Sequence, residues 1–431
     1  MTSIRRLSLL PAAALLAASC ATARPDPALA PSGPVGAAEL LDDITWLAAD
    51  ARQGRATGEP GLDSAAAFVA RRYASLGIAP MSGAGLDGYM QPFTAHAIMA
   101  RGQPAAELPT QNVVAMIPGS DPALANQYIV LGAHLDHLGR SPSNALDPDS
   151  LNAIRNGADD NASGTVAVLE LARRLKADPP RRSVILTHFS GEEFGLLGSQ
   201  YFVENSPVPL ASVQAMINFD MVGRLKNDRL IVYGVGTAAE LPALLDSVNA
   251  GSGLVLSKVP DGIGPSDHAS FHTKDVPVLH FFTDIHDDYH RATDDAWRIN
   301  AEGMLRVVDL AEEMTRALAN RPGKLAVTRT VATTRTGSSR SSGVYLGSIP
   351  DMGAADIAGM KLSGVRAGSP ADKGGLRAGD VIIEFGGKAV KDIYEYTDAL
   401  NSFKPGDVVQ VLVVRDGQRL TLTVTLGSRD G

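Results

Sequence analysis

The sequence predicts a mixed α/β domain, in which helices flank a mostly parallel central sheet, followed by a small β-rich domain. Apolar runs rich in β-branched residues alternate with stretches of helical spacing over most of the chain. These apolar runs are nearly continuous, which is typical of strands buried on both faces of a parallel sheet. The chain has 431 residues, too many for one ordinary domain, so we expect two.

Six apolar runs are the expected strands of the large domain. They cover residues 112–117, 128–134, 183–189, 215–220, 230–235 and 276–282. Apolar residues at helical spacing predict helices from Ala37 onward and over residues 62–76, 165–177, 238–249 and 301–319. The last of these helices closes the large domain, which we place at residues 37–320.

The C-terminal part begins with a basic, Ser- and Thr-rich stretch. Residues 321–342 carry five basic and no acidic residues, which indicates an exposed linker. Beyond it, residues 343–428 combine short strands, tight glycine turns and one helix near 393–400. This composition predicts the second, smaller domain.

The N-terminus is typical of an export signal. Two arginines precede a mostly apolar stretch, residues 7–18, that is too short to span a membrane. The stretch ends at Cys20, the only cysteine, in a setting similar to a bacterial lipobox. We therefore expect residues 1–20 to be a signal peptide with lipidation at Cys20; ordinary signal-peptidase cleavage is the alternative. Residues 21–36, with four prolines, are expected to form an extended tether.

These features predict an exported protein. No Asp follows Cys20 directly, which favours a lipoprotein that faces the periplasm from the outer membrane; a soluble periplasmic or secreted protein is the alternative. The formal net charge is -8, with no basic block, which argues against nucleic acid as a partner.

Histidines and acidic residues of metal-binding type recur along the large domain. They are His134 in AHLDH, Asp160 in GADDNASG, Glu192 and Glu193 in SGEEFG, Asp220 in NFDMVG and His290 in DYHRATDD. Several of them lie at or just past predicted strand ends, where α/β sheets place their sites. Imidazole and carboxylate ligands, with one shared carboxylate, suit a pair of divalent ions.

Each motif carries its own chemical argument. Asp136 lies on the same side of an extended segment as His134, so it can orient the imidazole. Of two adjacent glutamates, one can bind a metal while the other takes a proton from water. Asp220 is flanked by apolar residues and needs a partner or a metal. Alone, each motif is weak, because its residues equally suit caps, loops or surfaces.

In this order, the motifs resemble the aminopeptidase branch of the M28 family of zinc metallopeptidases over roughly residues 38–318. The resemblance implies two Zn²⁺ ions, one held by His134 and Asp220 and the other by Glu193 and His290. Asp160 would bridge them; it is preferred over Asp159 because the family motif GxxDN places the bridging acid directly before Asn161.

The resemblance also implies the catalytic roles. Glu192 would be the general base that activates the metal-bound water, Asp136 would support a ligand, and Tyr289 would stabilise the oxyanion. The segment GPSDHASFHTKDVPVLHFFTD is similar to a family segment beside the substrate, which implies that Asp267 and His268 belong to the substrate pocket. Nearby, His137, His286 and Asp287 have no assigned role.

The C-terminal domain resembles a PDZ domain through GSPADKGGLRAGDVI and LTLTVTL. PDZ domains bind C-terminal carboxylates in a loop of backbone amides, here expected at Tyr345, Leu346, Gly347 and Ser348. Ser348 stands where an apolar residue is usual, so a scaffold or gating role is the alternative to binding a peptide or protein partner.

The sequence thus predicts an aminopeptidase that removes N-terminal residues from peptides with a free amino terminus. The alternatives are a single-zinc glutaminyl cyclase, a carboxypeptidase-type relative, and a non-catalytic adaptor in which the PDZ domain does the binding.

Overall fold

The computed structural model describes most of both predicted domains. The described residues are 35–83, 85–97, 106–141, 145–147, 150, 152–328, 344–350, 358–365, 368–391, 395–396, 399–400 and 402–428. Cys20, nearly all of the tether and most of the linker lie outside them, so lipidation and export stay predictions. Among the described helices, none has the length and apolar character needed to cross a membrane.

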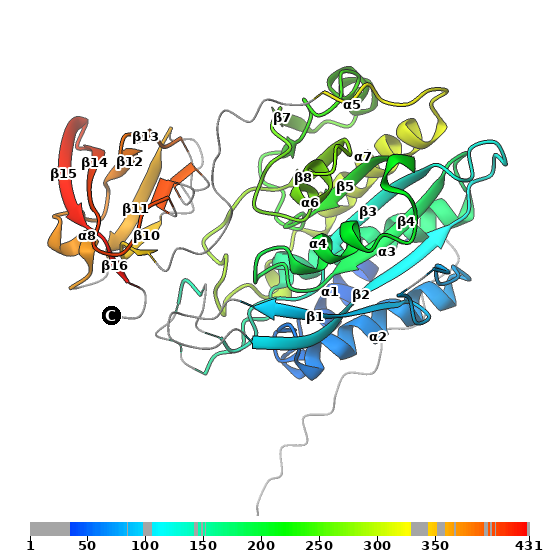
Figure 1. Ribbon diagram of the computed structural model, residues 1–431, viewed down its shortest axis with the longest axis horizontal. Helices are drawn as coiled ribbons and strands as arrows, with labels where there is room; N and C mark the ends of the chain where they lie inside the picture. Colours follow the sequence, from blue (N-terminus) through cyan, green and yellow to red (C-terminus); the bar gives the residue numbers. More distant parts are fainter. Residues whose placement is uncertain are drawn as a thin grey trace, which may run out of the picture.

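An eight-stranded mixed sheet forms the centre of the large domain (Figure 1). Its strand order is β1-β2-β4-β3-β5-β8-β6-β7. The neighbours β4, β3, β5 and β8 run parallel, whereas β1, β2 and β6 join antiparallel partners. The strands are β1 (Met90–Ala97), β2 (Ala106–Ile117), β3 (Tyr128–His134), β4 (Ser183–Phe189), β5 (Val213–Phe219), β6 (Arg229–Tyr233), β7 (Val255–Val259) and β8 (Val278–Phe282). This arrangement confirms the predicted mixed, mostly parallel sheet.

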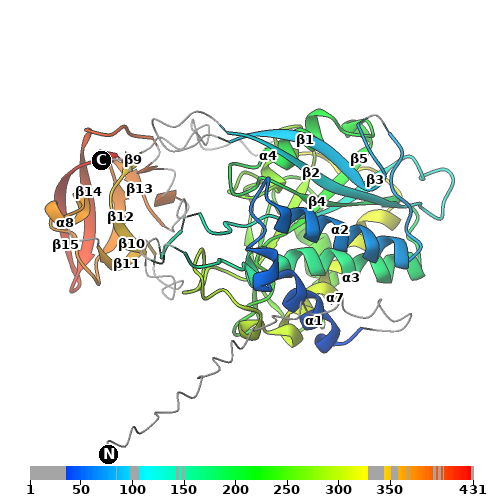
Figure 2. The same ribbon diagram turned by 90° about the horizontal axis from the view of Figure 1, so that it is seen from below.

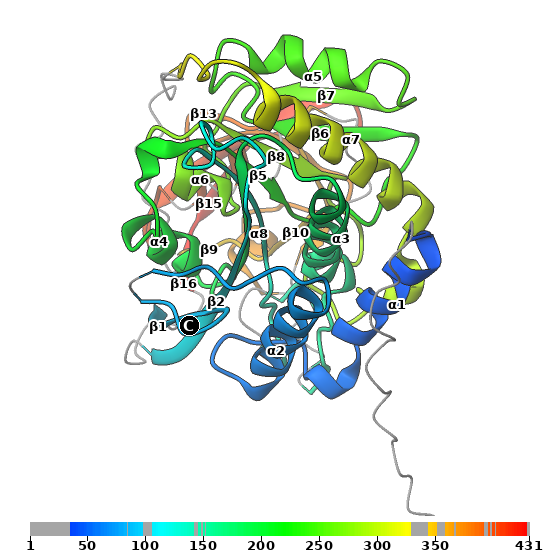
Figure 3. The ribbon, with the colours of Figure 1, turned by 90° about the vertical axis from the view of Figure 1, so that its right-hand side faces the viewer.

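Helices cover both faces of this sheet. Figure 2 shows α1, α2, α3 and α7 together beneath the strands, and Figure 3 shows α4 and α6 on the opposite side from α3. The helices are α1 (Ala37–Leu47), α2 (Pro60–Ser75), α3 (Gly164–Ala177), α4 (Leu197–Glu204), α5 (Leu241–Asn249), α6 (His268–His272) and α7 (Ala301–Asn320). Since both faces are covered, every residue of β4 and β5 is buried.

The core beneath the sheet explains why the first helices form where the spacing predicts. Leu40, Ile44 and Leu47 of α1 are buried in one apolar cluster with α2, α3 and α7. Trp46 stacks on Phe68 of α2 with ring centroids 4.2 Å apart. These contacts fix the N-terminal segment against α2, α3 and α7.

Four elements of the large domain escape the sequence prediction. The strands β1 and β7 lie at the two edges of the sheet, and β7 has no buried residue, so its sequence lacks the apolar run of a central strand. The helices α4 and α6 have eight and five residues, too few for a clear helical period.

The C-terminal domain has its own sheet and core. Its strands are β9 (Val344–Tyr345), β10 (Ser348–Pro350), β11 (Met360–Val365), β12 (Val381–Phe385), β13 (Lys388–Ala389), β14 (Val408–Arg415), β15 (Gln418–Thr425) and β16 (Gly427–Ser428), with α8 (Pro370–Lys373). A separate apolar cluster, which includes Phe385 and Val411, lies within it. Half of the helix predicted near 393–400 falls outside the described residues; the other half, 395–396 and 399–400, is helical.

Candidate metal centre

The predicted metal-type residues meet at the carboxyl ends of the central parallel strands. His134 is the last residue of β3, and Asp220 directly follows β5. Glu192 and Glu193 come shortly after β4, and His290 lies in the loop after β8. The sheet topology therefore brings together residues that are far apart in the sequence.

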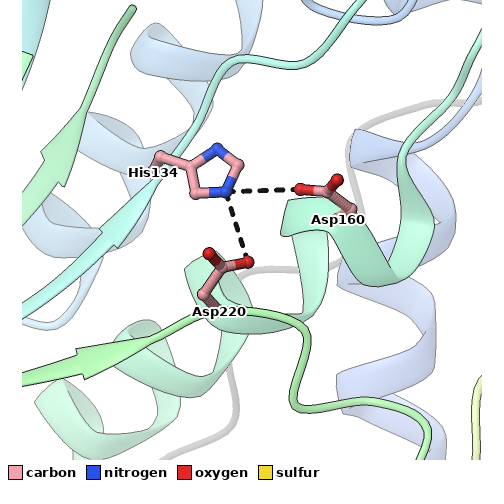
Figure 4. A group of neighbouring side chains, drawn as sticks. All are labelled: His134, Asp160 and Asp220. Carbon is pink, nitrogen blue, oxygen red and sulfur yellow. Dashed lines mark hydrogen bonds and ion pairs between the residues drawn. The ribbon is translucent and has the colours of Figure 1, made fainter. Parts of the chain in front are cut away.

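His134 forms the first group of donors with two carboxylates (Figure 4). Its Nε2 lies 3.3 Å from Asp160 Oδ1 and 3.3 Å from Asp220 Oδ1. Its Nδ1 lies 3.1 Å from the backbone oxygen of Asp136, which can only accept, so Nδ1 carries the proton. Nε2 is then the nitrogen that faces the two carboxylates and is the one placed to bind a metal.

A second group forms on the other oxygen of Asp160. His290 Nε2 lies 3.2 Å from Asp160 Oδ2 and 3.3 Å from Glu193 Oε2. His137, which had no assigned role, places Nδ1 2.7 Å from Glu193 Oε1. The Asp160 carboxylate thus lies between two sets of donors, each with a histidine and a second acid.

The neighbouring Asp159 has a different environment. Its Oδ1 accepts a hydrogen bond from the Gly223 backbone at 2.7 Å, and its Oδ2 lies 3.1 Å from His286 Nε2. Asp159 therefore braces the loop, while Asp160 faces the donors.

Buried polar groups hold the Asp160 loop in place. The carboxylate of Asp294 accepts the backbone N–H groups of Asp159 and Asp160 at 3.0 Å each. The Asn161 amide donates to Phe219 O at 2.9 Å, and its oxygen accepts from Gly164 N. The loop is thereby tied to β5, which leads into Asp220.

Arg55 braces the same loop from the N-terminal segment. Its guanidinium is fully buried and donates to the backbone oxygens of Leu47, Leu135, Asn156 and Gly157 at 2.7–2.9 Å. Burial lowers the pKa of Arg55 to about 10, so it remains charged at neutral pH.

Asp136 acts differently from the sequence prediction. Its carboxylate Oδ1 is 3.9 Å from His134 Nδ1, too far for a hydrogen bond. Instead, the carboxylate accepts from Thr57 Oγ1 at 2.8 Å and from Glu192 N at 3.2 Å. The chain turns after β3 so that the backbone oxygen of Asp136 orients His134, while its side chain positions the Glu192 segment.

The electrostatics of the cluster favour a cation. Burial opposes a charge on His134, but the carboxylates of Asp220 and Glu192 outweigh it and raise the His134 pKa well above its usual value. Burial, reinforced by Glu193 and Asp220, raises the pKa of Glu192 well above its usual value, although His134 opposes this. Both pKa values rise because several carboxylates share a buried space, which favours a proton or another positive charge there.

A cavity opens directly over the donors. Its lining includes His134, Asp160, Glu192, Asp220 and His290, with Met221, Pro265, Ser266, His280, Phe282 and Tyr289 around them. Tyr289 stacks on His290 with ring centroids 3.8 Å apart. Burial, together with the nearby carboxylates, raises the Tyr289 pKa well above its usual value, so its hydroxyl stays a donor.

The two predicted pocket residues lie behind this wall. Asp267 and His268 are fully buried and are not among the residues that line the cavity. Ser266 lies in front of them and donates to Asp220 Oδ2 at 2.8 Å. Asp267 is the N-cap of the one-turn helix α6 and His268 is its first residue; their assignment to the substrate pocket stays a prediction.

Sequence reasoning missed Arg55, Thr57, Ser266 and Asp294 as parts of the site. Arg55 and Thr57 lie in no motif, whereas Ser266 and Asp294 lie in GPSDHASFHTKDVPVLHFFTD and DYHRATDD without an assigned role. Each of the four acts through the backbone or side chain of another residue. A buried arginine in an otherwise unremarkable segment gives no signal that it will bind carbonyls over 100 positions away. His137 had a signal, since it follows His134 and Asp136 in AHLDH.

Comparison with known proteins agrees with this geometry. Residues 112–315 match the model of peptidase family M28, and residues 339–426 match the PDZ domain model. The large domain is therefore similar to M28 peptidases, and the two domains are called the M28 domain and the PDZ domain below.

Several curated proteins that are similar to this chain are named as leucine aminopeptidases. Leupeptin-inactivating enzyme 1 of Streptomyces exfoliatus is 30% identical over 274 residues, which cover 63% of this chain and 53% of that protein. A probable leucine aminopeptidase of Trichophyton verrucosum is 32% identical over 176 residues, or 38% of this chain and 44% of that protein. The chain thus spans about half the length of the curated relatives it matches.

Solved structures share the fold of the M28 domain. A Zn-dependent exopeptidase from Parabacteroides distasonis superposes with a TM-score of 0.54 at 18% identity, over 68% of this chain and all of that one (100%). The glutaminyl cyclase of Porphyromonas gingivalis gives 0.53 at 20% identity, over 65% of this chain and 97% of that one. At these identities the likeness establishes the α/β fold alone. The reaction has to be inferred from the residues of the site.

Proposed function

We propose that this protein is an aminopeptidase that uses two Zn²⁺ ions to hydrolyse the first peptide bond of peptides with a free amino terminus. The observation that carries the proposal is the position of Asp160. One oxygen of its carboxylate faces His134 and the other faces His290, at 3.3 and 3.2 Å. Two ligand atoms that share a tetrahedral zinc ion lie about 3.3–3.4 Å apart, given bonds of about 2.0–2.1 Å.

Five residues would hold the two ions. His134 and Asp220 would bind one, Glu193 and His290 the other, and Asp160 would bridge them. When bound, such ions polarise the scissile carbonyl and lower the pKa of water. Support comes from the donor set itself, because imidazole and carboxylate oxygens are ligands that zinc prefers.

Glu192 would be the general base. It lines the cavity beside the donors, and no metal role is needed for it because Glu193 supplies the carboxylate near His290. Its raised pKa suits a group that takes a proton from water and passes it to the leaving amine near neutral pH. Asp136 would support it, since the Asp136 carboxylate accepts the Glu192 backbone N–H.

Tyr289 would donate a hydrogen bond to the developing oxyanion. Its raised pKa keeps the hydroxyl protonated, and the residue lines the cavity. The carboxylates around the cavity favour a positively charged substrate amine, which suits a free N-terminus.

A variant of Glu192 tests the proposal. Glu192→Gln should lower kcat/KM for an unblocked peptide by about 10²–10⁴-fold, because a general base contributes that much. Its zinc content, measured by atomic emission, should stay near two ions per chain. Glu302→Gln, a change at the start of α7, is the matched control and should leave both values unchanged. Undiminished activity in Glu192→Gln would refute the mechanism.

The products distinguish the rival reactions. An aminopeptidase releases the N-terminal amino acid from a free peptide and leaves its N-acetylated form intact. A glutaminyl cyclase would release ammonia from a peptide that begins with Gln, without a free amino acid. An adaptor on this fold would release neither.

For the PDZ domain we propose recognition of a peptide carboxyl terminus. The support is the loop before β10, where Gly347 has φ +80°, a conformation that favours glycine. Ser348 Oγ and Tyr396 Oη lie 2.7 Å apart, so a polar pair replaces the usual apolar contact. Fluorescence anisotropy with a library of C-terminal peptides, and with the same peptides amidated, tests the proposal; equal binding of both forms would contradict it.

A further inference from the structure

His137 is the buried histidine of the metal centre that the proposed mechanism does not use. It is 1% exposed, and its Nδ1 lies 2.7 Å from Glu193 Oε1 and 3.7 Å from Asp160 Oδ2. His137, Asp160 and Glu193 together could hold a metal ion. His137 is therefore either a further ligand or a residue that positions Glu193.

The distance to Glu193 favours the second role. Two atoms bound to one tetrahedral zinc ion lie about 3.3–3.4 Å apart, and the contacts of His290 with Asp160 and Glu193, at 3.2 and 3.3 Å, agree with this value. The His137–Glu193 separation of 2.7 Å is that of a charge-assisted hydrogen bond. A hydrogen bond here requires the proton to lie on His137 Nδ1.

The environment of Nε2, on the other side of the His137 ring, also indicates that the proton lies on Nδ1. His137 Nε2 is buried and has no hydrogen-bond partner among the described residues. If Nδ1 bound a metal, Nε2 would carry the proton, and a buried N–H would lack an acceptor. With the proton on Nδ1, the ring donates to Glu193 and no donor is left unpaired.

The ring is held firmly enough to position its partner. Gly157, at φ +57°, packs against it so closely that a Cβ on Gly157 would lie 2.6 Å from two ring carbons of His137. The backbone N–H of His137 donates to Arg55 O at 3.2 Å, which ties it to the buried arginine. The ring edge also faces His290, with centroids 5.8 Å apart.

We infer that His137 positions Glu193 for the second metal ion by donating its Nδ1 proton to Glu193 Oε1. This bond occupies one carboxylate oxygen and turns the other, Oε2, toward His290. The inference rests on the proposed two-metal function. It adds a residue that sets the affinity of one ion without touching either ion.

Asparagine and leucine at position 137 test this inference. The amide nitrogen of Asn superposes on Nδ1 of His, so His137→Asn retains the donor, whereas His137→Leu removes it and keeps an apolar side chain of similar reach. Zinc affinity is measured by competition with a chromophoric chelator on the full chain. His272→Asn and His272→Leu, at the end of α6, are the matched controls.

His137→Leu should weaken one of the two zinc equivalents by about 10–100-fold, the usual effect of losing a partner of a metal ligand. His137→Asn should stay within about threefold of the unmodified protein. After substitution with Co²⁺, both variants should keep the visible absorption bands of the unmodified protein, because no ligand is lost. If both variants bind zinc equally weakly and their Co²⁺ absorption bands change, His137 is a ligand. If both variants bind zinc as tightly as the unmodified protein, His137 has no positioning role. Either result overturns the inference.

Two measurements keep the outcome interpretable. The unfolding temperature of each variant in excess chelator shows whether it folds; if His137→Leu does not, His137→Gln, whose amide cannot superpose on Nδ1, replaces it with the same expectation. If the unmodified protein binds no zinc, the proposed function fails together with the inference. Alternatively, the unmodified protein binds two ions and releases amino acids, while His137→Leu binds both ions as tightly as it does. In that case only the inference fails.

Discussion

Replacing Arg55 by Met should destabilise the M28 domain because Arg55 satisfies four buried carbonyls. Its guanidinium bonds to backbone oxygens of Leu47, Leu135, Asn156 and Gly157, which belong to three separate segments. Methionine fills a similar volume but donates nothing, so the four oxygens lose their shared partner.

The expected size of the effect follows from these bonds. At about 1 kcal/mol for each lost hydrogen bond, the free energy of unfolding should fall by about 4 kcal/mol. A loss of 1 kcal/mol lowers the unfolding temperature of a large domain by about 2–4 °C, so the shift should be about 8–16 °C. Zinc affinity should fall as well, because Asn156 and Gly157 lead directly into the Asp160 loop.

Arg182 provides a matched control elsewhere in the same domain. It is also almost fully buried, and it donates to the backbone oxygens of Ala319 and Arg321 at 3.1 and 2.6 Å. Calorimetry in excess chelator and zinc competition should be run on Arg55→Met and Arg182→Met together. Both variants should unfold at lower temperature, but only Arg55→Met should bind zinc more weakly.

Two results would refute this reasoning. A change of less than 2 °C for Arg55→Met would mean that water or another group replaces the guanidinium at no loss. Tighter zinc binding by Arg55→Met would mean that removing a competing positive charge outweighs the loss of loop positioning.

Two further predictions concern buried ionisable groups outside the metal centre. Burial lowers the pKa of His188 to about 3, so between pH 6.5 and 3 the unfolded chain binds more protons, and His188 should reduce the free energy of unfolding by about 2 kcal/mol from pH 6.5 to 5. His188→Gln should flatten this pH dependence in denaturant titrations of the metal-free protein; an unchanged slope would exclude His188 as its source. In the PDZ domain, Arg415 bonds to the fully buried Asp380 carboxylate at 2.6 and 2.7 Å, so Arg415→Leu should lower PDZ stability by about 3–5 kcal/mol. Adding Asp380→Asn should restore part of that loss in the same urea titration, and a double variant as unstable as the single one would contradict the pairing.

The central strands were predictable because burial on both faces leaves a direct trace in sequence. The predicted runs 128–134 and 183–189 coincide with β3 and β4. Edge strands leave a weaker trace, because β7 has only exposed and partly exposed residues and therefore lacks the continuous apolar run of a buried strand.

The metal centre was predictable as a set of donors but not as a network. His134, Asp160, Glu193, Asp220 and His290 lie in motifs, and their proximity follows from strand ends that meet at one edge. The direction of Asp136 was not predictable, because it depends on how the chain turns after β3. Whether Asp267 and His268 face the cavity or the core was not predictable for a similar reason, since it depends on how the chain enters the short helix α6.

The scattering of the donors along the chain links metal binding to the completion of folding. His134, Glu193 and His290 meet only when β3, β4, β5 and β8 are all paired, so a partly assembled sheet offers no complete binding site. A ligand that binds only the native state stabilises it by mass action, by about 4 kcal/mol at a concentration 1,000 times its Kd. Zinc should therefore bind only after the sheet has formed and then stabilise the folded domain. A chelator should destabilise regions of the M28 domain that do not contact the ion.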